Sequence, residues 1–170
     1  VSLIEPEKFL YTNNVSLNAL ADLVLCKEKF AQEYNQLNRI AIMPGFIGTN
    51  LKGHVTTLGR NGSDYSAAVL AVCAQAKSCE IWTDVDGVYN ADPRFIKDAT
   101  LLDYLSYQEA MELSYFGASV LHPKTIGPIA QYHIPCLIKN TGNPEAKGTL
   151  IANENDQKKQ VKAISNLDNL

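Results

Sequence analysis

The sequence predicts an α/β domain built on a mostly parallel sheet, and two observations support this fold class. Short apolar runs that suit buried strands alternate along the chain with segments whose apolar residues recur at helical spacing. Uniformly apolar strands of this kind are typical of parallel sheets, which helices cover. Hydrophobic residues make up 46% of the 170 residues, which is enough for a packed core.

The N-terminal part of the chain is expected to supply one covering helix and two strands. Residues 1–14 look irregular, and Ser16 is the expected cap of a helix that runs to about Tyr34, with apolar residues on one face. The other expectations here are a buried parallel strand over 39–43, a loop over 44–50, and a strand over 55–58 after a hairpin tip at Lys52–Gly53.

The remainder of the chain continues the alternation. Turns are expected at Asp86–Gly87 and Asp92–Pro93, where the residue pairs favour chain reversal. The expected elements are a buried small-residue helix over 65–76, a strand over 79–83, a helix from a Ser106–Glu109 capping box to about Tyr115, a helix over 123–132, a strand over 135–139 and an edge strand over 149–152.

Composition and charge exclude several classes of function. The net charge is −3 and no basic stripe occurs, which argues against binding to nucleic acid or to a membrane surface. No apolar run is long enough to span a membrane. The four cysteines form no C-x-x-C pair and do not cluster with histidines, so we expect reduced thiols in a cytoplasmic protein and no metal site.

A glycine turn between a strand and a helix, residues 58–64 (LGRNGSD), is the first candidate site. Gly59 and Gly62 let the backbone approach a ligand, and the N–H groups at the helix start, near Ser63, favour an anion. Arg60 suits a carboxylate or phosphate, and Asp64 suits an ammonium group. Each also has an ordinary interpretation, since arginine is common in surface turns and aspartate is favoured at helix starts.

A second candidate site follows the strand over 79–83. A hydroxyl, two carboxylates, an aromatic ring and a guanidinium occur within twelve residues, from Thr83, Asp84, Asp86, Tyr89 and Arg94. Tyr89 and Arg94 could flank a nucleotide by stacking and by phosphate pairing, although plain turn chemistry also explains the aspartates. Neither a P-loop nor a G-x-G-x-x-G motif is present. We expect His122 to be structural and the other histidines to lie on the surface.

Several segments in fixed order resemble aspartate kinases. They are 58–67 (LGRNGSDYSA), 82–89 (WTDVDGVY), 92–94 (DPR) and 116–123 (FGASVLHP). Two further segments, 136–144 (CLIKNTGNP) and 161–167 (VKAISNL), are most similar to the bifunctional aspartokinase–homoserine dehydrogenases. The resemblance covers almost the whole chain, and four ordered motifs are far more specific than any one of them.

This resemblance implies the amino-acid-kinase fold, an α/β/α sandwich also found in carbamate and glutamate kinases. The implied reaction transfers a phosphoryl group from MgATP to the side-chain carboxylate of aspartate, the first step towards lysine, threonine and methionine. Arg60 would bind an aspartate carboxylate, and Asp64 would help to hold its ammonium group. The residues that would line the ATP site are Thr83, Asp84, Tyr89, Arg94, Ser119 and Val120.

The chain departs from the family pattern in two places. The Lys-Phe-Gly-Gly-Thr-Ser type of segment that usually opens the family is absent, and Ser119 stands where the family usually has a lysine. We therefore expect residues 1–152 to be the C-terminal, nucleotide-side portion of a kinase domain, 153–160 a linker, and 161–170 the start of a regulatory domain. Such a fragment would be inactive alone, and its uncovered apolar surface would favour self-association.

Two alternatives to an aspartate kinase stay open. One is a related amino-acid or carbamate kinase of the same fold, although the combination of Arg60 and Asp64 favours an α-amino-acid substrate. The other is a non-catalytic nucleotide-binding or regulatory module, which the absent lysine segment and Ser119 would favour.

Overall fold

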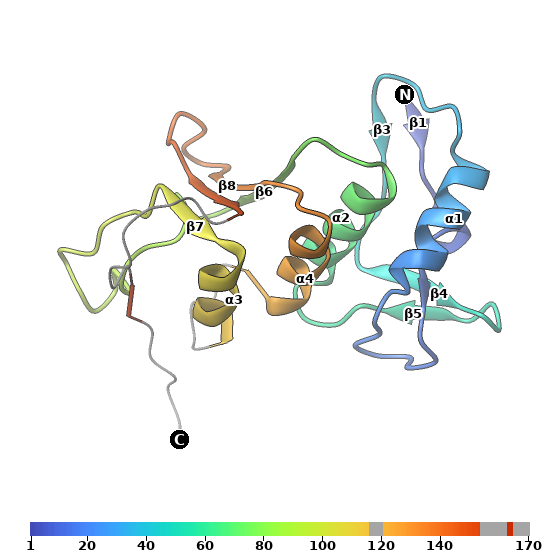
Figure 1. The fold of residues 1–170 in the computed structure, drawn as a ribbon, viewed down its shortest axis with the longest axis horizontal. Helices are drawn as coiled ribbons and strands as arrows, with labels where there is room; N and C mark the ends of the chain where they lie inside the picture. The colour runs from blue at the N-terminus through green and yellow to red at the C-terminus, as the bar shows by residue number, and fades with distance from the viewer. Residues whose placement is uncertain (116–120, 154–162, 165–170) are drawn as a thin grey trace. The chain divides into compact units, whose positions relative to one another are not determined.

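The chain folds as two compact units, Val1–Ala76 and Lys77–Leu170 (Figure 1). The computed structural model describes residues 1–115, 121–153 and 163–164. Each unit is described by itself below. The predicted α/β class is confirmed, and four of the six strand pairings among these residues are parallel.

The first unit contains two small sheets and two helices. A two-stranded sheet pairs β1 with β3 in parallel, and a three-stranded sheet has the order β2-β4-β5. The elements are β1 (Ser2–Leu3), a 3-10 helix (Pro6–Lys8), β2 (Tyr11–Thr12), α1 (Leu23–Glu33), β3 (Ala41–Ile42), β4 (Ile47–Asn50), β5 (Val55–Thr57) and α2 (Gly62–Cys73).

The core of the first unit lies where α1 and α2 pack together. Phe9, Phe30 and Tyr34 form an aromatic cluster, with the Phe9 and Phe30 ring centroids 5.0 Å apart in an edge-to-face arrangement. The buried residues of this core are Ile4, Phe9, Leu10, Cys26, Phe30, Leu58, Tyr65, Val69 and Cys73. The prediction of a buried small-residue helix is therefore confirmed, one turn earlier than expected.

The predicted start of the first helix at Ser16 is wrong. Asp22 caps α1, and its Oδ1 accepts hydrogen bonds from the backbone N–H groups of Val24 and Leu25 at 3.1 and 3.0 Å. The carbonyl of Ser16 instead accepts from the N–H of Thr57, because residues 16–19 run along β5 and find their backbone partners there. The helix ends at Tyr34, as expected.

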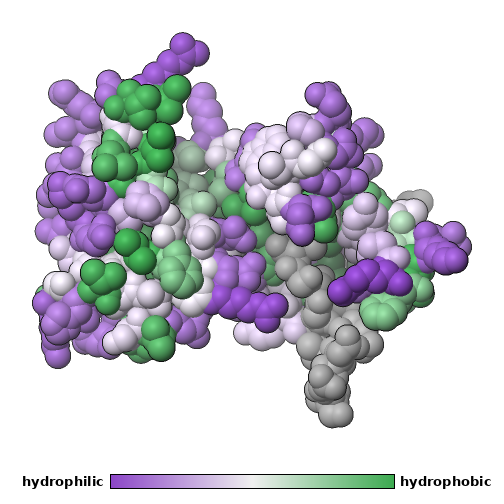
Figure 2. All heavy atoms as spheres, turned by 180° about the vertical axis from the view of Figure 1, so that it is seen from behind, coloured by the Kyte–Doolittle hydropathy of each residue, from purple (hydrophilic) through white to green (hydrophobic). Residues whose placement is uncertain are grey.

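The predicted buried strand over 39–43 is also only partly correct. β3 pairs with β1 in parallel, but the side chains of Ile40 and Ile42 are 59% and 58% exposed, so this segment is not a buried strand. Apolar side chains accordingly gather on the surface of this unit (Figure 2). The expected loop over 44–50 contains β4, which joins β5 in the predicted hairpin.

The second unit contains a four-stranded sheet in the order β6-β8-β9-β7 and two helices. Its elements are β6 (Cys79–Thr83), β7 (Tyr104–Ser106), α3 (Tyr107–Tyr115), α4 (Pro123–Gln131), β8 (Cys136–Asn140) and β9 (Thr149–Ala152). The predicted strand and helix positions are confirmed within two residues. The prediction of β9 as an edge strand is wrong, because β9 pairs with β8 on one side and with β7 on the other.

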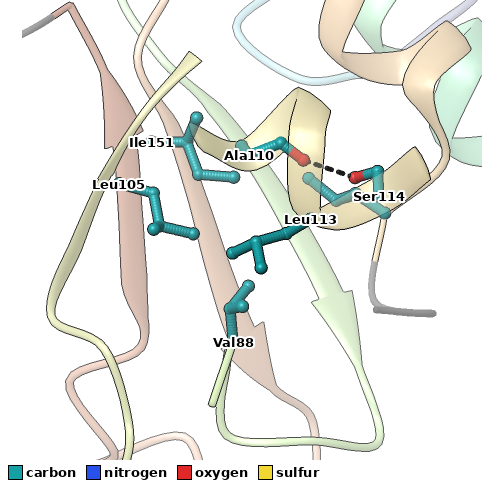
Figure 3. Close-up of a pocket in the computed structure, with 7 residues that line it drawn as sticks. Val88, Leu105, Ala110, Leu113, Ser114 and Ile151 are labelled. Atoms are coloured by element: carbon teal, nitrogen blue, oxygen red, sulfur yellow. Dashed lines mark hydrogen bonds between the residues drawn. The ribbon is translucent and has the colours of Figure 1, made fainter. Parts of the chain in front are cut away.

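Helix α3 covers the part of the sheet formed by β7 and β9, and a small apolar cavity remains beneath it (Figure 3). The predicted capping box holds the helix start: the Ser106 N–H donates to Glu109 Oε2 at 2.8 Å, and the Glu109 N–H donates to Ser106 Oγ at 3.1 Å. The cavity is lined by Val88, Leu105, Ala110, Leu113, Ser114, Leu121 and Ile151.

All four cysteines are buried and free, as expected. Burial raises the pKa of the Cys26 and Cys73 thiols to about 12, so neither is a reactive thiolate at neutral pH. The expected linker and regulatory segment fall mostly on 154–162 and 165–170, outside the described residues. Across the part of the chain that the structure describes, no helix is long and apolar enough to cross a membrane.

Candidate functional site

A tight turn places the first candidate site at the start of α2. The Gly62 N–H donates to the Gly59 carbonyl at 3.0 Å, which closes the turn before the helix. Gly59 has a φ of +79°, and a Cβ there would lie 2.4 Å from Oδ1 of Asn18. Both the left-handed backbone and the close approach therefore require glycine at this position.

The first turn of α2 presents backbone donors without a side-chain cap. Asn61 occupies the cap position in the left-handed conformation, and its side chain makes no capping bond. Among the described residues, the N–H groups of Ser63 and Asp64 have no hydrogen-bond partner. Helix-start N–H groups in this state favour an anionic ligand.

Arg60 and Asp64 carry opposite charges on this turn, and neither forms an ion pair with a described residue. Arg60 is exposed, whereas Asp64 is half-buried and accepts only a long 3.5 Å hydrogen bond from the Asn61 amide. Burial raises the pKa of the Asp64 carboxyl above its usual value, and the Asn61 hydrogen bond opposes this shift. A cation beside Asp64 would therefore relieve the cost of its partly desolvated charge.

The loop before β4, which the sequence predicted within 44–50, contacts the first turn of α2, and this contact was not predicted. The Phe46 N–H donates to Ser66 Oγ at 3.2 Å, and Ser66 Oγ donates to the Ser63 carbonyl at 2.8 Å. Phe46 also has a φ of 78°, an uncommon conformation for a bulky residue, although its side chain is 43% exposed. The sequence signals for this loop were the Pro44–Gly45 pair and the glycines after a predicted strand, and neither signal indicated the contact with Ser66.

The second candidate site begins at the carboxyl end of β6. Thr83 is the last residue of the strand, and its Oγ1 donates to Oδ1 of the exposed Asp84 at 3.1 Å. The Thr83 carbonyl accepts from the Thr141 N–H at 2.8 Å, so the loop after β8 lies against this strand end. Such strand ends are where open α/β sheets place their ligands.

Asp86 links the two loops at this strand end. Its Oδ1 accepts hydrogen bonds from Nδ2 of Asn140 at 2.7 Å and from Nδ2 of Asn143 at 3.2 Å. Oδ1 of Asn140 accepts from the Gly142 N–H at 2.8 Å, which fixes the orientation of the Asn140 amide. Neither asparagine was predicted as a site residue, because no sequence signal connects positions so far apart.

Tyr89 and Arg94 lie further along the same loop. Tyr89 forms an antiparallel bridge with Leu101, which makes this part of the loop a short ladder. Arg94 is held by Asp92: its Nε lies 3.0 Å from both carboxylate oxygens, and a second nitrogen lies 2.6 Å from Oδ2. Hydrogen bonds from Arg94 lower the pKa of the Asp92 carboxyl.

The remaining predictions fall into two groups. Ser119 and Val120 lie outside the described residues. His122 is structural, as expected: it caps α4, and its Nδ1 accepts from the Lys124 N–H at 3.1 Å. His54 and His133 are exposed, as expected. Within the described ranges, no group of three potential ligand residues could hold a metal ion.

The structure keeps the two candidate sites in different units. Gly59, Arg60, Gly62, Ser63 and Asp64 come together on the turn and first helical turn of the first unit. Thr83, Asp84, Tyr89 and Arg94 share one loop of the second unit. Each set could bind one charged or aromatic ligand through the groups described above.

Comparison with known proteins assigns the chain to a family. It is 51% identical over 171 aligned residues to a bifunctional aspartokinase/homoserine dehydrogenase of Haemophilus influenzae, matching 100% of this chain and 21% of that protein. The chain thus spans about a fifth of the length of the curated relatives that head the comparison.

Two solved structures are also similar. E. coli aspartokinase III in complex with aspartate and ADP has a TM-score of 0.84 and 39% identity, over 91% of this chain and 35% of that one. The aspartate kinase of Clostridium acetobutylicum has a TM-score of 0.79 and 34% identity, with the same coverage. The profile of the amino acid kinase family matches residues 8–140, and the chain therefore belongs to the amino acid kinase family.

Proposed function

We propose that the chain is part of an aspartate kinase, which transfers a phosphoryl group from MgATP to the side-chain carboxylate of L-aspartate and forms 4-phospho-L-aspartate. The observation that carries the proposal is the pair of unpaired opposite charges at the start of α2. Arg60 and Asp64 match the α-carboxylate and the ammonium group of an amino acid. The likeness to an aspartokinase solved with aspartate and ADP supports the same substrates.

Each residue has a positioning or charge-neutralising role in this proposal. Gly59, Gly62 and Ser63 shape the turn that presents N–H groups to the substrate carboxylate. The residues proposed to line the ATP site are Thr83, Asp84, Tyr89, Arg94, Ser119 and Val120. Phosphoryl transfer needs little covalent chemistry from the protein, so orientation and electrostatics supply most of the catalysis.

Magnesium would enter with the nucleotide. Mg²⁺ in kinases is held by substrate phosphates together with one or two carboxylates. The exposed carboxylate of Asp84 at the end of β6 is chemically suited to this, and the metal would neutralise charge on the transferring phosphoryl group. The proposed roles of this chain's residues are to hold the nucleotide, not to build a dedicated metal cage.

We also propose the setting in which this activity operates. The similarity to bifunctional proteins supports an enzyme that also carries a homoserine dehydrogenase region, in a cytoplasmic pathway towards lysine, threonine and methionine under allosteric control. The exposed apolar side chains of the β1–β3 sheet support self-association into a homo-oligomer. We propose no nucleic-acid or membrane partner.

A coupled assay on the full-length protein tests the proposal, with aspartate, glutamate and acetylglutamate compared as phosphoryl acceptors. We expect ADP release that depends on aspartate alone. Equal or greater turnover with another acceptor would instead favour a related amino-acid kinase.

Ser119 favours a second candidate function, a nucleotide-binding or regulatory module without catalysis. The family usually has a lysine there, and its loss removes a cation near the phosphates. Binding of ATP without turnover of any acceptor would support this alternative.

A further inference from the structure

The loop that carries the proposed nucleotide residues is fastened to the sheet at two points. At one, Oδ1 of Asp86 accepts from the amides of Asn140 and Asn143 at 2.7 and 3.2 Å. At the other, the Val88 N–H donates to Oγ1 of the buried Thr149 at 2.8 Å. The residues between Thr83 and Tyr89 therefore have little freedom to move.

The second point is itself held firmly. Oγ1 of Thr149 donates to the Leu102 carbonyl at 2.6 Å, so one hydroxyl joins both sides of the ladder that contains Tyr89. A Cβ on Gly87 would lie 2.5 Å from the same oxygen, which shows how closely the loop packs on β9. Thr149 holds the side of the loop that packs on β9, whereas Asp86 holds the side at the ends of β6 and β8.

The first point is a charged group held by neutral amides. A hydrogen bond to a carboxylate is stronger than a hydrogen bond between two neutral groups. The bonds from Asn140 and Asn143 also join positions that are 54 and 57 residues from Asp86 in the sequence. Because the Gly142 N–H occupies Oδ1 of Asn140, the Nδ2 of that amide must point at Asp86. Asn140 is therefore the donor and Asp86 the acceptor, and exchanging the two residues would reverse the direction of this hydrogen bond.

We propose that Asp86 is a positioning residue for the nucleotide, and that Asn140 and Asn143 act through it. The three residues lock the loop after β6 onto the loop after β8, and thereby fix Thr83, Asp84 and Tyr89 in the orientation that receives ATP. The inference rests on the proposed nucleotide site. Asp86 holds the loop and does not itself contact the phosphates.

Asn140→Asp in the full-length protein is the first test. It places two carboxylates where a 2.7 Å hydrogen bond now lies, so it should displace the loop. We expect the KM for ATP to rise by about tenfold or more, with the KM for aspartate within about twofold of the parent. Asn13→Asp is the matched control, since Asn13 Oδ1 only accepts from backbone N–H groups and a carboxylate can replace it.

The decisive variant is the exchange Asp86→Asn with Asn140→Asp. In this double variant the amide nitrogen of residue 86 donates to the carboxylate of residue 140. The Asn143 amide, which donates to the same Oδ1 as Asn140 in the parent, must turn to the carbonyl oxygen of residue 86. We expect the KM for ATP to return to within about threefold of the parent. Asp86→Asn alone should raise it only about twofold, because the carbonyl still accepts both amides, in weaker neutral hydrogen bonds. Recovery of the KM for ATP in the double variant would show that Asn140→Asp acts through the contact with Asp86 and not through general destabilisation of the fold.

A third variant tests the inference even if Asn140→Asp does not fold. Asn143→Ala removes only the 3.2 Å contact of an exposed residue and should raise the KM for ATP about two- to threefold at an unchanged melting temperature. Unchanged KM values for ATP in Asn140→Asp and Asn143→Ala, or an exchange variant no better than Asn140→Asp, would overturn the inference. A parent protein without aspartate kinase activity would instead overturn the proposed function.

Discussion

The two candidate loops treat their charges in opposite ways. On the turn before α2, Arg60 and Asp64 have no ion-pair partner among the described residues, and burial raises the pKa of Asp64. On the loop after β6, Arg94 is paired with Asp92, and Asp86 with two asparagine amides. The charges of the first loop are available to a charged ligand, whereas Arg94 on the second loop must leave Asp92 before it can bind one.

This difference assigns the loops different energetic roles. A partly desolvated carboxylate gains most from a cation that arrives with the ligand, so the first loop should set how strongly the substrate charges are held. An exposed arginine–carboxylate pair contributes little to stability and is readily exchanged, so Arg94 can move to a phosphate at small cost. Substitutions should therefore have larger effects on the first loop than on the second.

The largest expected effect comes from Asp64→Ala in the full-length protein. Removal of the carboxylate leaves the substrate ammonium without its partner, and we expect aspartate kinase activity to fall by at least about 10³-fold. Asp22→Ala is the matched control, because it also removes an aspartate from a helix start but should cost only stability. Activity within a few-fold of the parent would remove Asp64 from the substrate site.

The contrast between the loops also shows what sequence could predict. Local signals identified the turn at Gly59–Asp64, the strand that ends at Thr83 and the capping box at Ser106, because each depends on neighbouring residues. The Asp86–Asn140 bond and the contact between Phe46 and Ser66 were missed, because they depend on which distant segments meet. The prediction of a helix cap at Ser16 was wrong for the same reason, since the backbone of residues 16–19 forms hydrogen bonds with Thr57 of β5.

Arg60→Ala should have the next largest effect. The guanidinium fork is suited to bidentate carboxylate binding, so its loss should raise the KM for aspartate by about 10- to 100-fold and leave the KM for ATP unchanged. Arg60→Lys keeps the charge but loses the fork, so its KM for aspartate should lie between those of the parent and Arg60→Ala. Steady-state kinetics with each substrate varied would show this, with Arg39→Ala as the control. A change in the KM for ATP instead would reverse the assignment of the loops.

Ser119→Lys tests the proposed nucleotide site by adding a charge. A lysine at the position where the family usually has one should tighten ATP binding by about three- to tenfold. Calorimetric titration of the parent and the variant measures this directly, and Ser78→Lys on an exposed position controls for the added charge. Unchanged or weaker affinity would show that charge loss at this position does not limit nucleotide binding.

Asp92→Asn sharpens the idea that Arg94 must change partners. The substitution removes the carboxylate that competes with phosphate for the guanidinium, so the KM for ATP should fall by about twofold. Arg94→Ala should raise it, and in that background Asp92→Asn should have no further effect. A double-mutant cycle measures this coupling, and additive effects would mean that Arg94 does not bind the phosphates.

The smallest expected effect concerns stability. The pKa of Asp64 is raised above the usual 3.8, so the folded state keeps this proton to higher pH than the unfolded chain. Ionisation of Asp64 therefore costs folding free energy above its folded-state pKa, and the cost is absent below the usual value. Asp64→Asn should remove the cost and raise the free energy of unfolding at neutral pH slightly, because solvent screens the charge of this half-exposed side chain.

Urea denaturation of this chain and of Asp64→Asn across pH would measure the difference. The advantage of the variant should be full at pH 7 and should vanish as the pH falls below the usual aspartate pKa of 3.8, because both side chains are then neutral. A variant less stable than the parent at pH 7 would mean that the folded chain already satisfies the Asp64 charge. The first loop would then lose the feature that separates it from the second.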